Sequence, residues 1–245
     1  MGEPRTYRTR AGGGRLAAFE VVVKQTDLHV QARSDLSALA REAVLEQRGY
    51  IEAYIRRHPE FLSTLAPWPL ADPAPQIVRD MIAAGNAAGV GPMAAVAGAV
   101  AEHVGRKLLA HSAEVIVENG GDIFLQTAEA ATVAIGAGRS PLSFKIGIRT
   151  SGGGDPIAVC TSSGTVGHSL SFGRADAVCV TARSGALADA AATAVGNRIR
   201  NRQDISVGIE FAKRVAGVLG VLIVADGAMG TWGAVEVVVL SPKKG

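Results

Sequence analysis

The side chains best suited to chemistry gather in one glycine-rich stretch, residues 160–197. It contains consecutive hydroxyls, a histidine, and an aspartate followed four residues later by a threonine: Thr161, Ser162, Ser163, His168, Asp189 and Thr193. Glycines stand between them and allow a ligand to approach the backbone closely. We expect the rest of the chain to be a scaffold for this stretch.

Asp189 and Thr193 would share one face of a helix, because they are four residues apart. A carboxylate and a hydroxyl oxygen on one face suit Mg²⁺, which keeps several waters and often borrows oxygens from substrate phosphates. An exposed or capping pair is the ordinary alternative, since such pairs are common at helix starts. Spacing alone therefore favours the capping explanation over a metal site.

The run Thr161–Gly164 follows an expected strand and could present hydroxyls and amides to a phosphate. It lacks the Gly-Lys-Ser/Thr ending of a Walker loop. His168 lies close by in the sequence and could accept a proton from an attacking hydroxyl or water. The chain has no Gly-x-Ser-x-Gly elbow, which argues against a serine hydrolase.

A second candidate segment is the turn formed by Asn119, Gly120, Gly121 and Asp122. Paired glycines permit backbone angles that are closed to other residues, and Asp122 could either tie the turn or face a ligand. This signal is weak when taken alone.

Composition excludes several classes of protein. The chain has 245 residues, 48% of them hydrophobic and 19% charged, which is enough to bury a full core. Its apolar runs are shorter than the roughly 20 residues that cross a bilayer, so we expect no membrane partner. The N-terminus lacks a signal-peptide pattern, and the two cysteines suggest reduced thiols, so we expect a cytoplasmic protein.

The net charge of +3 comes mainly from the N-terminal arginines and from Arg198, Arg200 and Arg202. Aromatic residues make up only 4% of the chain, which leaves few stacking platforms for bases. We therefore expect no nucleic-acid partner. The three arginines suit an anionic small molecule or, more simply, a solvated helix end.

The spacing of the apolar residues, and the glycines and prolines that interrupt it, predict an α+β fold. Residues 1–18 are expected to be a flexible N-terminal segment, and residues 19–245 a single large domain. Ser34 is expected to cap the first helix. The alanine and glycine face of residues 94–105 must pack closely against another helix or a flat ligand, and helix packing is favoured. The expected helices are 35–57, 76–88, 92–110, 186–200 and 208–216. The expected strands are 19–24, 28–33, 114–118, 131–136, 144–149, 157–160, 175–182, 219–224 and 235–240.

These motifs, in this order, resemble the ApbE superfamily, the FAD:protein FMN transferases. The matching segments are Asn119–Ile123, the Thr-Ser-Ser-Gly run at 161–164, His168, and Ala188-Asp189 with Thr193. Val90–Gly98, Val117–Asp122 and the whole of 160–197 are similar to an uncharacterised ApbE-like branch, over about residues 19–240. Two departures stand out. The acidic residue that follows the transferases' histidine is absent from Ser169–Gly173, and their N-terminal Met-Gly-Thr strand is not found at its expected place.

The resemblance implies an ApbE-like α+β fold of mixed, largely antiparallel sheets with packed alanine-rich helices, and a groove for FAD and Mg²⁺. It implies that Asp189 and Thr193 hold the metal and that His168 is the base. The residues it places around the nucleotide are Asn119, Gly120, Gly121, Asp122, Thr161, Ser162, Ser163 and Gly164. It further implies FMN transfer from FAD to an acceptor protein, or cleavage of the FAD pyrophosphate.

Two other functions stay open on the sequence. One is a non-catalytic binder of an anionic cofactor or metabolite that keeps the same pocket. The other is an accessory protein in sulfur or methyl-group metabolism with Cys160 as a reactive thiol, which requires exposure and a lowered pKa. The alanine-rich helix faces suit a homodimer and a monomer core equally well.

Overall fold

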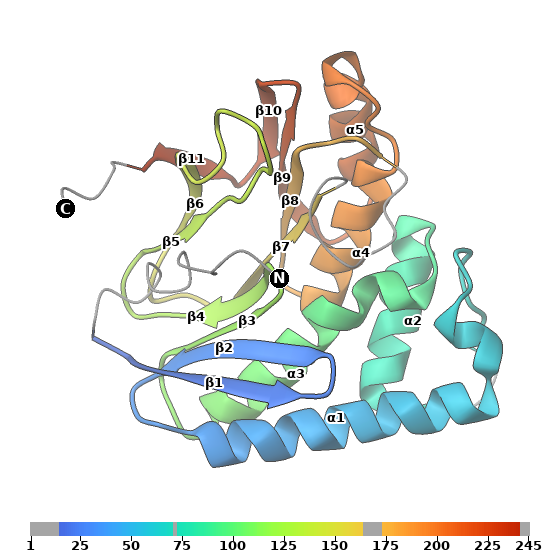
Figure 1. Ribbon diagram of the computed structural model, residues 1–245, viewed down its shortest axis with the longest axis vertical. Coiled ribbons are helices and arrows are strands. Elements are labelled where there is room, and N and C mark those ends of the chain that lie inside the picture. The colour runs from blue at the N-terminus through green and yellow to red at the C-terminus, as the bar shows by residue number, and fades with distance from the viewer. Residues whose placement is uncertain (1–14, 71–72, 164–172, 241–245) are drawn as a thin grey trace.

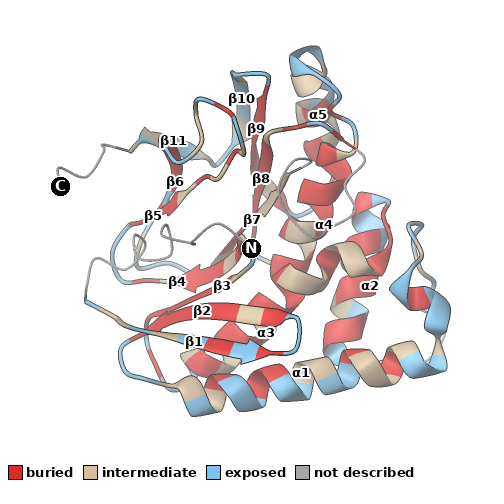
Figure 2. Ribbon diagram, in the orientation of Figure 1, coloured by how far each residue is buried: buried red, intermediate tan, exposed pale blue. Residues whose placement is uncertain are grey.

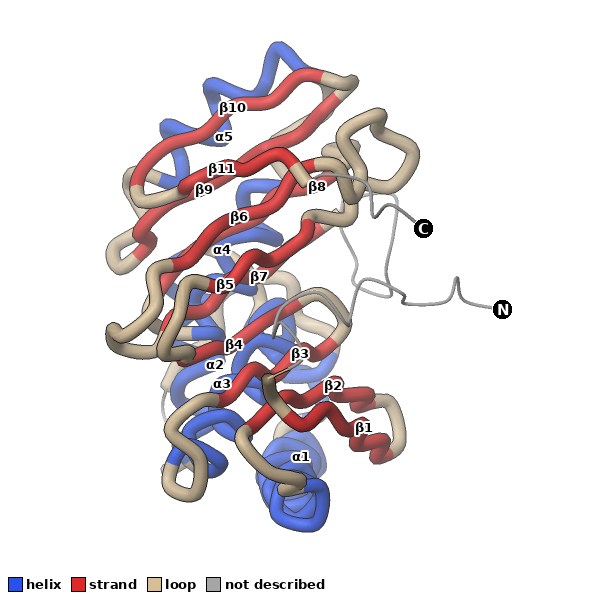
Figure 3. Tube along the Cα trace, turned by 90° about the vertical axis from the view of Figure 1, so that its left-hand side faces the viewer, coloured by secondary structure: helices blue, strands red, loops and turns tan. Residues whose placement is uncertain are grey.

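Helices cover one face of a long sheet, and a small second sheet covers the other (Figures 1 and 3). The structure is a computed structural model that describes residues 15–70, 73–163 and 173–240. Eight strands form the long sheet in the order β1-β2-β3-β4-β7-β8-β9-β10, and three form the small sheet in the order β11-β6-β5. Each strand pairing among these residues is antiparallel. The expected α+β class in a single domain is confirmed.

The elements have the following bounds. The helices are α1 Ser37–Arg57, η2 Pro59–Leu62, α2 Gln76–Ala88, η3 Pro92–Ala95, α3 Val96–Leu109, α4 Gly185–Gly196, η4 Arg202–Asp204 and α5 Ile205–Ala212. The strands are β1 Ala17–Val23, β2 Thr26–Ala32, β3 Val115–Asn119, β4 Asp122–Gln126, β5 Ala131–Ala134, β6 Ile146–Thr150, β7 Ile157–Ser162, β8 Ala177–Ala182, β9 Val218–Ala225, β10 Ala228–Gly233 and β11 Glu236–Val239.

The beginning of α1 differs from the sequence-based expectation. Ser34 does not cap the helix; Leu36 occupies the N-cap position and makes no side-chain cap bond. Instead, Asp35 accepts a hydrogen bond from the Ser37 amide at 2.8 Å through Oδ1. The carboxylate of Asp35 therefore satisfies one of the free amides that every helix start exposes.

Two strands of the long sheet, β4 and β10, were not predicted. The sequence was interpreted as a turn that ends at Ile123, whereas Asp122–Gln126 forms a central strand between β3 and β7. Strand β10 contains Met229, Gly230 and Thr231, so this tripeptide lies on the last strand of the long sheet.

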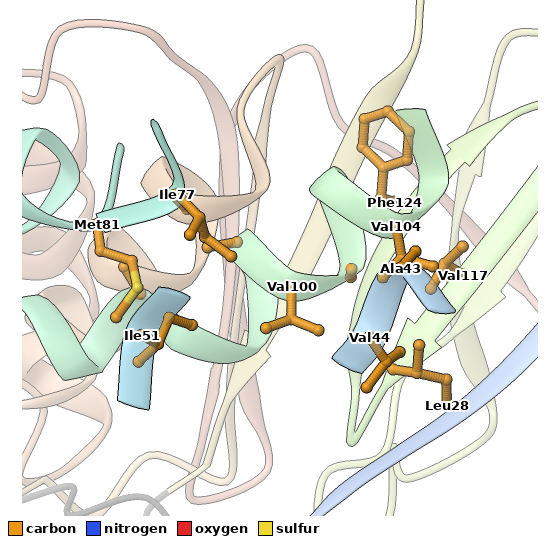
Figure 4. Close-up of a cluster of buried hydrophobic side chains, with 14 of the residues drawn as sticks. Leu28, Ala43, Val44, Ile51, Ile77, Met81, Val100, Val104, Val117 and Phe124 are labelled. Carbon is orange, nitrogen blue, oxygen red and sulfur yellow. The ribbon is translucent and has the colours of Figure 1, made fainter. Parts of the chain in front are cut away.

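Three hydrophobic clusters stabilise the layers. The first joins α1, α2 and α3 to strands β1–β4 and includes Val44, Ile77, Val100, Val117 and Phe124 (Figure 4). The second joins α4 and α5 to β7–β9, and the third fills the space between the two sheets. Helices α3 and α4 are mostly buried between other elements (Figure 2). Their positions are therefore fixed by packing on several sides.

Among the described residues, no single helix has the length and apolar composition to span a membrane. The helices Gln76–Ala88 and Pro92–Leu109 pass that test only as a pair, which is bent by 106°.

Candidate functional site

The Asn119–Asp122 segment is a tight hairpin turn between β3 and β4. Asn119 pairs with Asp122 across the turn. Gly120 and Gly121 form the two-residue loop with φ angles of +68° and +115°. Two positive φ values in a row are what a type I′ hairpin loop requires, and glycine adopts them without strain. The turn geometry therefore accounts for both glycines.

Asp122 begins β4 and points toward β7. Ile123 pairs with Val159, so the same antiparallel register places Asp122 opposite Cys160. The Thr161 amide donates to Oδ1 of Asp122 at 3.3 Å. Burial raises the pKa of Asp122 to about 7, although the Cys160 thiol and the Thr161 amide partly offset this effect.

The hydroxyl run on β7 is only partly free. Thr161 donates through Oγ1 to the Cys179 sulfur at 3.2 Å, and the Ser163 hydroxyl donates to the Asp176 carbonyl at 2.9 Å. Ser162 lies between them and is partly exposed. Its hydroxyl makes no hydrogen bond with the described residues, so Ser162 is the member of this run best placed to meet a ligand.

Asp189 of α4 reaches across to the beginning of α3. Its Oδ2 accepts a hydrogen bond from the Gly98 amide at 2.9 Å. Helix α3 has no side-chain cap of its own, because Ala95 occupies its N-cap position. The carboxylate of Asp189 therefore supplies the missing acceptor, and the positive end of the α3 dipole attracts it. The capping explanation is partly right, although the capped helix is α3 and not α4.

Burial raises the pKa of Asp189 well above its usual value. The neighbouring charge of Asp122 raises it further, while the amides of Gly98 and Ala97 act in the opposite direction. Each carboxylate opposes ionisation of the other when both lie in a protein interior. The charge of Asp122 therefore acts on Asp189, although the two residues are far apart in the sequence, whereas the neighbouring charge that raises the pKa of Asp122 is that of Glu118.

A matching contact fixes α4 against α3. Glu102 of α3 accepts hydrogen bonds through Oε2 from the Gly185 amide at 2.7 Å and from the Ser184 hydroxyl at 3.2 Å. Gly98 and Gly185 touch backbone to backbone where the helices cross, and a side chain at either position would overlap the carbonyl oxygen of the other. Each helix thus supplies a carboxylate that caps the start of its partner.

Thr193 lies one turn after Asp189 on the same face of α4. The residue is only 7% exposed. Its hydroxyl has no hydrogen-bond partner among the described residues, while its backbone carbonyl accepts from the Asn197 amide at 3.0 Å. The hydroxyl oxygen is not one of the fully buried side-chain atoms that lack a partner, so it reaches solvent and could contact a ligand, ion or water.

Asn119 ties the hairpin to the same helix start. Its Nδ2 donates to the Ala97 carbonyl at 3.1 Å. The first turn of α3 therefore contacts Asn119 from β3 and Asp189 from α4. The hairpin that begins at Asn119, the start of α3 and the helix α4 therefore meet at this point of the fold.

The described residues partly fit a divalent metal. They contain no group of three or more histidine, cysteine or acidic side chains that could hold an ion. Mg²⁺ does not require such a group, because one or two carboxylates with waters and substrate phosphates suffice. Asp189 with the unpartnered hydroxyl of Thr193 is a donor set of this oxygen type.

Two of the expected site residues, Gly164 and His168, lie outside the described residues. The expected role of His168 as a base stays a prediction. Sequence reasoning assigned no role in the site to Gly98 or Glu102. Gly98 had a detectable signal, because a glycine on an alanine-rich helix face indicates close backbone approach.

The two cysteines lie on opposite faces of the long sheet. Thr161 pairs with Cys179, so Cys160, the next residue along β7, points to the other side. Both thiols are buried and free, and burial raises the pKa of Cys160 well above its usual value and that of Cys179 to about 12. The structure therefore contradicts both requirements of the alternative in which Cys160 is a reactive thiol, namely exposure and a lowered pKa.

The arginines after α4 have structural partners. The guanidinium of Arg198 lies 3.5 Å from the centre of the Phe211 ring, and its Nη1 donates to the Ala194 carbonyl at 2.6 Å. Arg200 pairs with Asp204 at 3.2 Å. These contacts support the simpler explanation, in which Arg198 and Arg200 interact with the C-terminal end of α4 and the segment after it.

Comparison with known proteins identifies the family. A family model described as "AbpE bacteria" matches residues 8–217, and the chain belongs to this family. The UPF0280 protein of Methanococcus aeolicus is 37% identical over 231 residues, which cover 92% of this chain and 93% of that protein. The UPF0280 protein of Methanocaldococcus jannaschii is 39% identical over 230 residues, which cover 91% and 93%.

Solved structures of ApbE proteins share the fold. The flavin transferase ApbE from Vibrio cholerae aligns with a TM-score of 0.58 at 15% identity and covers 89% of this chain and 96% of its own. The flavinyl transferase ApbE of Pseudomonas stutzeri aligns with a TM-score of 0.59 at 15% identity and covers 89% and 94%. The ApbE-like fold expected from the motifs is therefore confirmed.

Proposed function

We propose that this protein is a Mg²⁺-dependent enzyme that acts on the pyrophosphate of FAD, either by transferring FMN to an acceptor protein or by hydrolysis. The observation that carries the proposal is that two oxygen donors share one face of α4: Asp189, which contacts the start of α3 through the Gly98 amide, and the Thr193 hydroxyl, which has no partner among the described residues. A carboxylate and a hydroxyl on one helix face suit an oxygen-preferring cation. The ApbE-like fold and the family membership support the flavin assignment.

In this proposal Asp189 and Thr193 hold the metal. The Gly98 amide donates to Oδ2 of Asp189, and a hydrogen-bonded neighbour of this kind orients a metal-binding carboxylate. A bound Mg²⁺ would neutralise charge on the diphosphate. Asn119–Asp122 and Thr161–Gly164 would line the nucleotide, with Ser162 supplying the free hydroxyl.

The reaction breaks the bond between the FMN phosphorus and the bridging oxygen, and AMP leaves with that oxygen. The attacking hydroxyl, from a protein threonine or from water, gives up its proton to a base, for which we propose His168.

The test is incubation of the pure protein with FAD and Mg²⁺, followed by chromatography for FMN and AMP and by mass measurement of any acceptor. We expect AMP from the wild type and at least a hundredfold less from Asp189→Asn. Asp80→Asn is the matched control, because Asp80 pairs with His103 at 2.8 Å on α2 and α3, outside the proposed metal contacts. The catalytic proposal is wrong if the wild type releases neither FMN nor AMP. Saturable FAD binding without turnover would then favour the non-catalytic binder.

A further inference from the structure

We propose that residues 1–14 dock within the same chain on the face of β1–β3 that lies away from the helices, and that Arg10 pairs there with Glu118. The inference goes beyond the proposed function and does not depend on it. It concerns the side of the long sheet opposite the helices, and it needs neither flavin nor metal.

Strand register places three polar side chains in one row on this face. Leu28 and Val30 of β2 belong to the cluster on the helix side, so His29 between them points to the other side. His29 pairs with Glu20 on β1 and with Glu118 on β3. Directly opposite residues of neighbouring strands lie on the same face, so the three side chains form a row across the sheet.

No helix or strand of the described chain covers this row. The strands of the small sheet lie farther along the long sheet, away from β1 and β2 (Figure 3), and the cluster between the two sheets contains no residue of β1 or β2. Nevertheless, His29 is 8% exposed, Gln31 is 5% exposed and Glu118 is 4% exposed. Polar side chains on a face open to solvent are mostly exposed, so this burial favours a further segment of the chain as their cover.

The chain reaches this face at Arg15. Its Nη1 and Nη2 donate to the two carboxylate oxygens of Glu114 at 2.7 Å and 3.0 Å. Glu114 directly precedes β3 and stands four residues before Glu118, so side-chain alternation puts both carboxylates on one side of the strand. Leu16 packs against the cluster between the two sheets, which is on the same side. The segment before Arg15 therefore starts from the face that carries the row.

The length of the segment matches the distance to the row. Glu118 lies about 13 Å beyond Glu114, at roughly 3.3 Å for each residue of a strand. Arg10 precedes Arg15 by five residues, and an extended chain of that length spans about 17 Å. Arg10 is thus the first arginine before Arg15 that can reach Glu118.

The charge of the segment is opposite to that of the row. Residues 1–14 contain three arginines and one glutamate, whereas the row presents two glutamates, Glu20 and Glu118. Arginine pairs strongly with a carboxylate because its planar group can donate two parallel hydrogen bonds. The contact of Arg15 with Glu114 is a pair of this kind on the same side of the sheet, and it shows the chemistry that we assign to Arg10 and Glu118.

The experiment is limited digestion of the full chain with trypsin, followed by mass spectrometry of the cuts after Arg8 and Arg10. The reference is a synthetic peptide of residues 1–14. A docked segment is held away from the protease, so we expect cleavage in the native protein to be at least tenfold slower than in the peptide. This ratio should not change with protein concentration.

Two variants and a control test the pairing. In Glu118→Gln the cuts after Arg8 and Arg10 should be at least fivefold faster than in the wild type. In Arg10→Gln the cut after Arg8 should be at least fivefold faster, and this substitution lies outside the folded body, so it decides the question even if Glu118→Gln does not fold. The control is Glu42→Gln, which removes an exposed carboxylate from α1 on the helix side and should leave the rates unchanged.

Three results would overturn the inference. The first is cleavage of the native protein as fast as cleavage of the peptide. The second is a rate in Arg10→Gln within twofold of the wild type. The third is protection that grows with protein concentration, because the segment would then dock on a second copy of the chain.

Discussion

Replacing Gly98 by alanine tests whether α3 and α4 meet as closely as the structure indicates. A Cβ atom at position 98 would overlap the Gly185 carbonyl oxygen and lie 2.8 Å from the Cβ of Asp189. The helices must then move apart, because backbone atoms cannot rotate away as a flexible side chain could. Overpacking of this kind costs about 1–3 kcal/mol. Alanine recovers up to about 1 kcal/mol through its better helix propensity.

We therefore expect Gly98→Ala to lower the free energy of unfolding by roughly 1–2 kcal/mol. The melting temperature should fall by about 2–4 °C for each kcal/mol in a chain of this size. The control is Gly49→Ala in α1, where an added Cβ has no atom within 4 Å and the glycine is exposed. This variant should gain up to about 1 kcal/mol from helix propensity alone.

The assay is urea denaturation of the three proteins side by side. A second measurement is a titration with Mn²⁺, followed by the loss of the electron paramagnetic resonance signal of the free ion. Gly98→Ala should also weaken Mn²⁺ binding, since it separates Asp189 from the amide that orients it. If Gly98→Ala is as stabilising as Gly49→Ala, the helices do not touch at this crossing and the reasoning fails.

Other variants test the contacts around this crossing. Glu102→Ala should cost about 1–3 kcal/mol in urea denaturation, because it leaves the buried Gly185 amide without an acceptor, and an unchanged midpoint would contradict that contact. The raised pKa of Asp122 means that its ionisation opposes folding. Without metal, the wild type should therefore lose stability relative to Asp122→Asn as pH rises from about 4 to about 7, by at most roughly 4 kcal/mol, while Asp189 titrates in both proteins; parallel pH curves would refute this. A thiol reagent should label neither Cys160 nor Cys179 until denaturant is added, and rapid labelling of the native protein would show that a thiol is accessible.

The elements that the sequence predicted well are those with a clear start or stop signal, such as a proline before the element or a glycine after it. Helix α2 spans Gln76–Ala88 as expected, because Pro75 precedes it and Gly89 ends it with φ of +72°. Strand β4 was missed because the glycine pair was interpreted as the end of an element, although two glycines between apolar runs also indicate a hairpin. Strand β10 is rich in glycine and partly exposed, so it has little of the strand pattern.

For the candidate site, helical spacing was enough to place Asp189 and Thr193 on one face. Spacing could not reveal the reciprocal contacts, because Glu102 and Gly185 are separated by 83 residues and meet only through the packing of two helices. The effect of the Asp122 charge on the pKa of Asp189 depends likewise on strand register and on the crossing of α3 and α4. These are properties of the whole fold, and local pattern does not encode them.

The most direct test of the central claim is an experimental structure of the protein with FAD and Mg²⁺. We predict a metal ion at about 2.0–2.1 Å from a carboxylate oxygen of Asp189 and from the Thr193 hydroxyl, with the FAD diphosphate and water completing its coordination. FAD bound elsewhere, or a diphosphate at the start of α3 with no metal near Asp189, would contradict the account.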